Sequence, residues 1–391
     1  MTKSTRAKAA KPPRPHADPS PLRAVALLFV AASLGCGLSA CGRKPIPVGV
    51  SLTLTGFTSQ IGVTGRNGIE LAAEAINAAG GVKGRPIKLL VRDDGDDPDK
   101  AVAADAELLA EGAVAIVGHM SSRSGVKAVP FLNEKKVVFV SPTISSTDWS
   151  GQDDYFFRPI GPNDLQGQAL AARARELGLS KAAALYESTN RAYTYKVYES
   201  FAAAFTAAGG AVGAPLSFSI AEEKDFPGLA RRLLQGDPDC ILSVAGPMEN
   251  ARLCQELAKL GSDLPVFAGM WSMNADLISN GGDTVGRMRV AGVMDLEDRR
   301  ETFAAFRAAY VDRFRQEPAF ASMFGYESLM LLAEGLRRAK GLSGDAIKKA
   351  ILGLRDFEGL QGPLEIDAFG DCRRPYRVFG VRGERFVPDQ G

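Results

Sequence analysis

The chain alternates short apolar runs with stretches of helical periodicity along most of its length. Residues 48–54 and 87–92 are runs rich in Val, Leu and Ile, and residues 64–79 between them repeat apolar side chains at helical spacing before Gly80-Gly81. Strands that are covered by helices on both faces carry such continuous runs. The alternation therefore predicts an α/β protein built of doubly wound, parallel sheets.

The same alternation continues through the rest of the chain. Asp97-Pro98 opens a helix, because aspartate suits the N-cap and proline suits the first helical position. Residues 156–163 break the pattern with Pro159, Gly161 and Pro162, which suit a linker. Further strands are expected at 114–117, 137–140, 182–186, 211–219, 240–245, 266–268, 290–293, 364–366, 376–380 and 385–387, and further helices at 164–177, 193–208, 227–235, 248–260, 300–315, 322–339 and 344–352. The sequence thus predicts two successive doubly wound units.

The first 40 residues form a segment of a different kind. Basic residues precede an uncharged apolar run at 24–34, and Leu38-Ser39-Ala40-Cys41 follows. This succession is typical of a secretory signal peptide, and the run is shorter than the ~20 apolar residues that a spanning helix needs. The tetrad resembles a bacterial lipobox. The mature protein is therefore expected to begin at Cys41, lipidated there and held on a membrane by several acyl chains.

Four alternatives for this segment are weighed against lipidation at Cys41. The segment could be cleaved without lipidation, or remain as an uncleaved anchor with Cys41 an ordinary small residue. Cys36 is a competing lipid site, but Ser33 stands where the leucine should be, so Cys41 is preferred. The polar stretch before the apolar run is long for a signal, so a start codon downstream of Met1 also stays open.

Composition excludes several classes of protein. A formal charge of +2 gives no basic surface for nucleic acid, and 46% hydrophobic residues suit a globular core. After Cys41 only Cys240, Cys254 and Cys372 remain, which are too few for a disulfide scaffold. A Cys240–Cys254 bridge stays open, although buried free thiols are the commoner state.

No motif for catalysis or for a cofactor stands out. Thr55-Gly56-Phe57 replaces the glycine pattern of a dinucleotide site, and the acidic run 93–97 lacks the glutamate of a calcium loop. His119 is the only histidine after the signal, so we expect it to be structural rather than a metal ligand. From the sequence we expect that the protein binds no cofactor and no metal and is not an enzyme.

Several segments in order resemble the Leu/Ile/Val-type periplasmic solute-binding proteins of ABC transporters. The opening match is VGVSLTLTGFTSQIGVTGRNGIELAAEAINAAGGVKGRPIKLLVRDDGDDPDKAV, followed by AIVGHMSSRSG, VVFVSPTISSTD, YFFRPIGPNDLQG, LYESTNRAYTY and LQGPLEIDAFGD. Each motif alone is weak, but the ordered set covers residues 46–391. The resemblance implies the type I periplasmic binding protein fold, in which two doubly wound lobes are joined by three crossover strands and close on a ligand.

The resemblance also implies a division of the chain. We expect a signal peptide at 1–40 and a lipid-anchored tether at 41–45. The first lobe is expected to comprise residues 46–160 and 293–374. The second lobe is expected to comprise residues 161–292 and 375–391.

Polar residues after two strands are candidates for holding a ligand in the first lobe. Ser121 and Ser122 lie between a predicted strand and a helix, where hydroxyls and backbone N–H groups can hold a carboxylate. Either serine could instead act as an N-cap, and the two roles are compatible. By resemblance Ser122 is the family's carboxylate-binding serine, and Thr143 and Ser145 hold the amino group and carboxylate of the ligand. A polar turn is the alternative for Thr143 and Ser145.

The second lobe offers two aromatic candidates. Tyr193 matches the family's aromatic that closes over the ligand, and Trp271 stands where amino-acid binders usually carry an acidic residue. This departure puts an α-amino-acid ligand in doubt, since an indole supplies apolar area or a π face. Either side chain could instead belong to the core. Gly246 falls where an aromatic is common, and Phe57 and Ile61 are weaker candidates for lining the cleft.

The resemblance implies a function. We expect an extracytoplasmic, lipid-anchored solute-binding protein, in the periplasm or on the cell surface, that captures an amino acid or related small carboxylate. It would deliver this solute to an ABC permease and its ATPase as a monomer, without binding nucleic acid. The alternative is a ligand-sensing receptor of the same fold acting on a membrane sensor. An enzyme on this fold would need an activated nucleophile, and Ser122 has no histidine partner other than His119.

Overall fold

The computed structural model describes residues 43–56, 58–223, 225–355 and 357–389. The predicted signal peptide, Cys41 and Phe57 lie outside these residues. The chain divides into two units, Met1–Lys44 and Pro45–Gly391, and the second unit holds the sheets and helices described below. No helix in the described ranges combines the length and the apolar composition that crossing a membrane requires.

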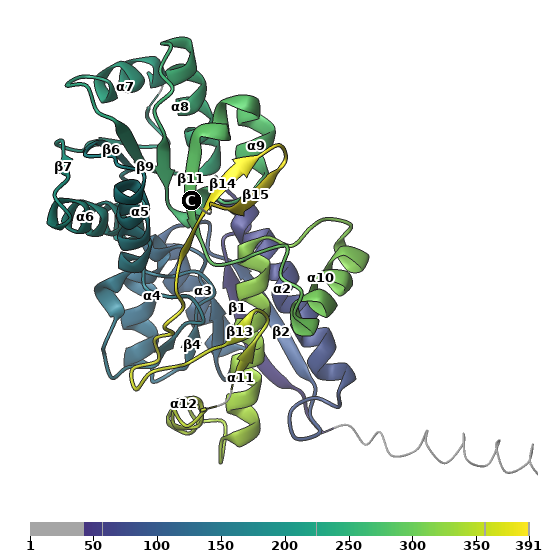
Figure 1. Cartoon of the computed structure of the whole chain (residues 1–391). Coiled ribbons are helices and arrows are strands. Elements are labelled where there is room, and N and C mark those ends of the chain that lie inside the picture. Colours follow the sequence, from purple (N-terminus) through teal and green to yellow (C-terminus); the bar gives the residue numbers. More distant parts are fainter. Residues whose placement is uncertain (1–42, 57, 224, 356, 390–391) are drawn as a thin grey trace, which may run out of the picture. The chain divides into compact units, whose positions relative to one another are not determined.

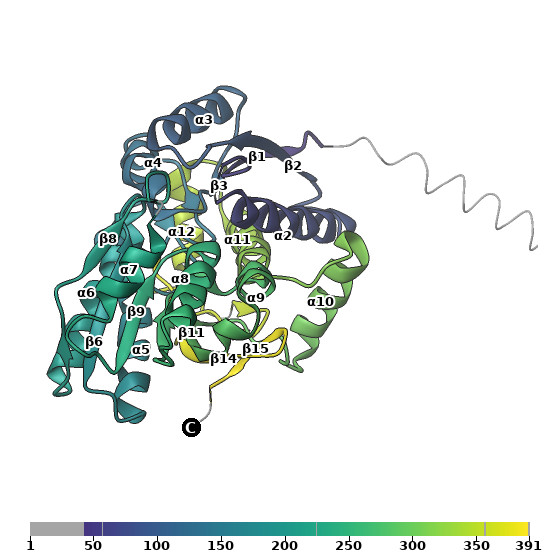
Figure 2. The ribbon, with the colours of Figure 1, turned by 90° about the horizontal axis from the view of Figure 1, so that it is seen from above.

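Five parallel strands form the first sheet, in the order β2-β1-β3-β4-β5. Helices α3 and α4 cover one face, and α2 and α11 lie side by side on the other (Figure 1, Figure 2). Asp97 caps α3 through bonds from the N–H groups of Asp99 and Lys100, as its sequence predicts. The elements are β1 (Ile46–Leu52), α2 (Ser59–Ala78), β2 (Ile87–Asp93), α3 (Pro98–Ala110), β3 (Ile116–Gly118), α4 (Ser122–Glu134), β4 (Phe139–Val140), η1 (Thr147–Trp149), β5 (Phe156–Phe157), α10 (Glu301–Phe314), α11 (Phe320–Arg338) and α12 (Gly344–Leu352).

The second sheet follows the order β15-β14-β11-β10-β9-β6-β7, with β8 also paired to β6. Its strands from β6 to β11 are parallel, whereas β14 and β15 add an antiparallel edge. Helices α5 and α6 cover one face, and α7, α8 and α9 cover the other (Figure 2). The elements are α5 (Asp164–Glu176), β6 (Lys181–Glu187), α6 (Arg191–Ala207), β7 (Ala211–Val212), β8 (Leu216–Phe218), α7 (Phe226–Leu233), β9 (Cys240–Val244), α8 (Pro247–Lys259), β10 (Val266–Ala268), η2 (Met270–Ser272), α9 (Ala275–Gly281), η3 (Gly282–Arg287), β11 (Met288–Gly292), β14 (Arg377–Arg382) and β15 (Arg385–Pro388).

The chain passes between the two sheets three times, after β5, after β11 and before β14. Two of these connections touch each other, because the Tyr376 hydroxyl donates to the Gly161 carbonyl at 3.0 Å and accepts from Gln166 at 3.3 Å. The chain thus builds two lobes joined by three connections. The residue boundaries expected for the lobes stay a prediction.

Some predicted strands differ in the structure. The strand expected at 211–219 is two short strands, β7 and β8, because Gly213 and Pro215 interrupt it and proline cannot donate to a ladder. The expected linker 156–163 begins with β5, which two phenylalanines form against β4. The strand expected at 364–366 is wrong: this segment makes only a bridge between Ile366 and Cys372. A short hairpin, β12 (Glu358–Gly359) with β13 (Gly362–Pro363), precedes it.

The three cysteines after Cys41 are free and buried. The bridge between Cys240 and Cys254 that the sequence left open is therefore absent. Burial raises the pKa of Cys254 and of Cys372 to about 12, so both thiols stay protonated and act as small apolar side chains.

Candidate ligand-binding site

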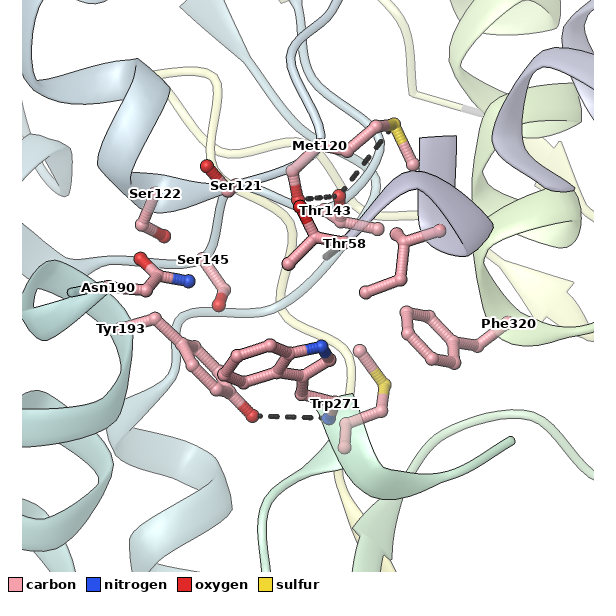
Figure 3. Close-up of a pocket in the computed structure, with 12 residues that line it drawn as sticks. Thr58, Met120, Ser121, Ser122, Thr143, Ser145, Asn190, Tyr193, Trp271 and Phe320 are labelled. Carbon is pink, nitrogen blue, oxygen red and sulfur yellow. Dashed lines mark hydrogen bonds between the residues drawn. The ribbon is translucent and has the colours of Figure 1, made fainter. Parts of the chain in front are cut away.

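A narrow cavity lies between the two lobes, where the carboxyl ends of both sheets face each other. Ligands of open α/β sheets sit at such strand ends. The cavity brings together all six residues predicted from the sequence, and the weaker candidate Ile61 also lines it. Its described lining is Thr58, Ile61, Met120, Ser121, Ser122, Thr143, Ser145 and Phe320 from the first lobe, and Asn190, Tyr193, Met270 and Trp271 from the second (Figure 3).

Ser121 and Ser122 differ in what their hydroxyls do. The Ser121 hydroxyl caps α4 by accepting from the Ser124 N–H at 3.1 Å, and it donates to the Asp96 carboxylate. Ser122 is the first residue of α4 and only 2% exposed, yet its hydroxyl has no hydrogen-bond partner among the described residues. Of the two roles weighed for this pair, Ser121 therefore takes the N-cap, and Ser122 is left with an unused hydroxyl.

The residues that follow β4 show the same division. Thr143 donates its hydroxyl to the Met120 carbonyl at 2.6 Å, which is the polar-turn role. Ser145 is 1% exposed and its hydroxyl has no partner in the described part of the chain. A buried hydroxyl left unbonded costs about 1–3 kcal/mol. The cavity therefore holds two hydroxyls, those of Ser122 and Ser145, that a ligand can satisfy.

The N-terminus of α4 adds to these hydroxyls. The first N–H groups of a helix have no acceptor within the helix, and the helix dipole makes this end positive. Because α4 begins at Ser122, these groups lie at the cavity wall. Hydroxyl and N–H donors at the positive end of a helix suit a carboxylate, although none of these donors carries a full charge.

The hydroxyl of Tyr193 makes two hydrogen bonds within the protein. It donates to Gln166 at 2.9 Å and accepts from the backbone N–H of Trp271 at 3.4 Å. Burial raises the pKa of Tyr193 well above its ordinary value, so the hydroxyl stays protonated. The hydroxyl proton of Tyr193 is therefore taken up inside the protein, and Tyr193 also fixes the backbone that carries Trp271 into the cavity (Figure 3).

His119 lies beneath this site, where it is fully buried. Its Nδ1 lies 2.5 Å from a carboxylate oxygen of Asp94, and its Nε2 lies 3.1 Å from one of Asp105. Burial opposes protonation, but the carboxylates of Asp105 and Asp94 outweigh it and raise the pKa of His119 to about 10. The His119 carbonyl also accepts from the Ser141 hydroxyl at 2.9 Å. His119 thus links the loop after β3 to the loop after β4 through its carbonyl and to Asp94 and Asp105 through its ring. Among the described residues, His, Cys, Asp and Glu form no group that could hold a metal ion.

Sequence reasoning missed several residues of the cavity. Met120, Met270 and Phe320 add apolar wall, and Thr58 and Asn190 add polar atoms. Asn190 could have been found, because it lies three residues after a strand and directly before a helix, as Ser121 does. None of the twelve described lining residues is Asp, Glu, Lys, Arg or His.

Comparisons with known proteins agree with this geometry. The sequence model of the family described as "Periplasmic binding protein" matches residues 45–385. Leu/Ile/Val-binding protein homolog 3 of Brucella melitensis is 26% identical over 353 residues, which cover 89% of this chain and 94% of the relative.

Two solved structures share the fold. The crystal structure of the leucine binding protein LivK from Thermotoga maritima has a TM-score of 0.82 and 24% identity, and covers 88% of this chain and 98% of that chain. A solute binding protein of an ABC transporter from Rhodopseudomonas palustris, in complex with 3,4-dihydroxybenzoic acid, has a TM-score of 0.77 and 22% identity, and covers 87% of this chain and 93% of that chain. These likenesses confirm the two-lobed fold expected from the sequence.

Proposed function

The chain belongs to the periplasmic binding protein family, and from this premise we propose that it is a solute-binding protein that captures a small carboxylate between its lobes. The observation that carries the proposal is a pair of buried hydroxyls without a partner among the described residues, that of Ser122 at the N-terminus of α4 and that of Ser145 in the loop after β4. The carboxylate accepts from these hydroxyls and from the first N–H groups of the helix, and charge-assisted bonds of this kind are about twice as strong as neutral ones.

Contacts from both lobes link binding to closure. The cavity is lined by Ser122 and Ser145 from one lobe and by Tyr193 and Trp271 from the other. A ligand that touches both lobes stabilises the closed state, because it loses its contacts with one lobe when the lobes separate. The closed protein then hands the solute to an ABC permease and its ATPase. We propose that it does so outside the cytoplasm, as a monomer anchored by lipid on Cys41.

The relatives suggest two ligand classes for this site. The name of the Thermotoga protein states leucine, and the Rhodopseudomonas complex contains an aromatic acid. Trp271, which stands where the family usually carries an acidic residue, and the uncharged lining of the cavity favour an acid without a free α-amino group.

Thermal unfolding and small-angle scattering of the protein from residue 42 test this proposal. Amino acids, aliphatic acids, aromatic acids and amides are added one at a time. A ligand at 100 times its Kd adds about 2.7 kcal/mol to the free energy of unfolding, and the radius of gyration should fall as the lobes close. If no acid in the panel raises the melting temperature or changes the scattering, the proposed function is wrong.

The lipid anchor is tested on the full chain. Mass spectrometry of the protein extracted from bacterial membranes should give an N-terminal peptide that begins at Cys41 and carries acyl chains. The Cys41→Ser variant should lose both the acyl mass and the membrane fraction. Acylation of Cys36 instead would contradict the choice of Cys41.

A further inference from the structure

Asn190 stands at a helix N-terminus, where an asparagine side chain ordinarily hydrogen-bonds to the backbone of its own helix. It is the N-cap of α6, and an N-cap asparagine usually accepts from the N–H two or three residues on. Here the backbone carbonyl of Asn190 accepts from the Tyr193 N–H, three residues on, at 2.9 Å and from the Thr194 N–H, four residues on, at 3.0 Å, and the side chain makes no capping bond. The side chain lines the cavity instead.

The amide oxygen of Asn190 is buried and has no hydrogen-bond partner among the described residues. Figure 3 shows Asn190 at the side of the cavity where Ser122 and Ser145 lie, with Phe320 at the other side. Three unsatisfied polar atoms therefore gather there, two hydroxyls from the first lobe and one amide oxygen from the second.

The two hydroxyls and the amide oxygen differ in the kind of hydrogen-bond partner that satisfies them. A hydroxyl can donate to a carboxylate, but an amide oxygen only accepts. A buried acceptor without a donor is unfavourable. The occupant of this end of the cavity should therefore present an acceptor to the serines and a hydrogen-bond donor to Asn190.

The donor should not carry a charge. The lining contains no carboxylate, and the Asp96 carboxylate behind it already accepts from the hydroxyls of Ser121 and Thr58. Glu249 and Asp276 line a neighbouring cavity, which shares Thr58, Ile61 and Trp271 with this one. A buried ammonium without a carboxylate partner is strongly unfavourable, whereas a hydroxyl satisfies the same acceptor without charge.

We propose that Asn190 is a ligand residue of the second lobe and that it selects a 2-hydroxy acid with an apolar or aromatic side chain. The carboxylate lies against Ser122 and Ser145, and the 2-hydroxyl donates to Asn190. The side chain of the acid contacts the apolar wall, which includes Trp271 and Phe320. This inference rests on the proposed function and names the substrate class of the same site.

A matched ligand series tests the chemistry directly. Isothermal titration of the protein from residue 42 compares leucine, 2-hydroxy-4-methylpentanoate and 4-methylpentanoate, and then phenylalanine, 3-phenyllactate and 3-phenylpropanoate. Within each series only the group on Cα changes, from ammonium to hydroxyl to hydrogen. We expect the hydroxy acid to bind at least about tenfold more tightly than the amino acid, and more tightly than the unsubstituted acid.

Two variants assign the preference to Asn190. Asn190→Ala should bring the affinity for the hydroxy acid down to that of the unsubstituted acid, whose own affinity stays unchanged. Asn190→Asp supplies a carboxylate for an ammonium, so it should shift the preference toward the amino acid. Asn280→Asp is the matched control, because it places the same charge on an exposed position of the same lobe. Equal melting temperatures without ligand verify that each variant folds.

The two proposals fail in different ways. If leucine binds as tightly as its hydroxy analogue, or if Asn190→Ala leaves the hydroxy acid unaffected, the inference is wrong and the proposed function stands. Tighter binding of 4-methylpentanamide than of either acid would also overturn the hydroxy-acid class. Absence of binding by every compound contradicts the proposed function itself.

Discussion

Neighbouring serines in the cavity carry out different tasks. The Ser121 hydroxyl satisfies the Ser124 N–H and reaches Asp96, whereas the Ser122 hydroxyl is buried without a partner. Removing a hydroxyl that makes a hydrogen bond lowers stability, whereas removing a buried hydroxyl that has no partner leaves stability unchanged or raises it. Binding and stability can therefore be separated at this point of the chain.

We predict that Ser122→Ala weakens binding of the cognate acid by about 10- to 100-fold, because a hydrogen bond to a charged group contributes about 1.5–3 kcal/mol. Without ligand, its melting temperature should stay the same or rise, since the variant removes an unsatisfied buried hydroxyl. Titration calorimetry and thermal unfolding measure the two effects. Ser121→Ala is the matched control and should lower the free energy of unfolding by about 1 kcal/mol through loss of the cap. An equal loss of stability in both variants without ligand would contradict this assignment.

His119 gives the first lobe a specific dependence on pH. Its pKa in the folded protein is about 10, against 6.5 for an ordinary histidine. The contribution of His119 is fully present below pH 6.5 and is lost as the pH rises through 10, because only the unfolded chain releases the proton in that window. We predict that the free energy of unfolding falls across this window, by about 1.4 kcal/mol per pH unit for one proton.

Nuclear magnetic resonance checks this prediction without a variant. His119 is the only histidine after residue 40, so the protein from residue 42 gives one imidazole signal. That signal should keep its protonated shift at pH 8, and chemical denaturation at several pH values should give the predicted slope. Titration of the signal near pH 6.5 in the folded protein would show that the two carboxylates do not hold the proton.

At the scale of elements, small residues decide how the first lobe is built. A Cβ atom at Gly68 of α2 would lie 2.0 Å from the Ser322 carbonyl oxygen of α11. A Cβ atom at Gly325 of α11 would lie 2.4 Å from the Gly65 carbonyl oxygen. The two helices therefore touch backbone to backbone, which glycine alone permits. Their closeness matters for the site, since α11 carries Phe320 and the segment before α2 carries Thr58.

We predict that Gly68→Ala lowers the free energy of unfolding by about 1–3 kcal/mol or more, because the added methyl group forces the helices apart. Its effect is opposite in sign to the gain that alanine gives an exposed helix. Gly286→Ala is the control, since a Cβ atom there would meet nothing within 4 Å. Denaturant unfolding compares the two. Equal stability of both variants would show that α2 and α11 tolerate separation.

At the scale of the whole molecule, side chains join the two lobes beside the cavity. The Asn274 amide donates to Gln60 at 2.6 Å, and Lys196 pairs with Asp148 at 3.4 Å. In each pair one residue belongs to the first lobe and the other to the second. Both contacts exist only while the lobes are together, so both favour the closed state.

We predict that Gln60→Ala raises the rate of ligand release several-fold and leaves the melting temperature without ligand nearly unchanged. Lys196→Ala should have a smaller effect that disappears at high salt, because an exposed ion pair contributes about 0–1 kcal/mol and is screened. Stopped-flow displacement at low and high salt measures both rates. Lys259→Ala is the control, since its partner Glu256 lies on the same helix. A release rate that none of these variants changes would mean that the lobes close without these contacts.

Most of the fold follows from local sequence. The order of strands and helices, the parallel sheets and the cap at Asp97 depend on residues a few positions apart, so periodicity and capping rules predict them. The errors lie where strands are only two or three residues long, as in β5 and β7. Such strands exist because a neighbouring strand pairs with them, and a local pattern does not contain that neighbour.

The sequence by itself determined that the six predicted site residues meet at the cavity, because the carboxyl ends of parallel strands converge whatever their side chains are. Only the tertiary structure decided which of these residues keep a free polar group. The Ser121 hydroxyl donates to Asp96, 25 positions away, and the Thr143 hydroxyl donates to the Met120 carbonyl, 23 positions away. The Tyr193 hydroxyl donates to Gln166, 27 positions away. The free atoms of Ser122, Ser145 and Asn190 are what remains after these long-range bonds form. Their chemistry therefore depends on packing across the whole fold.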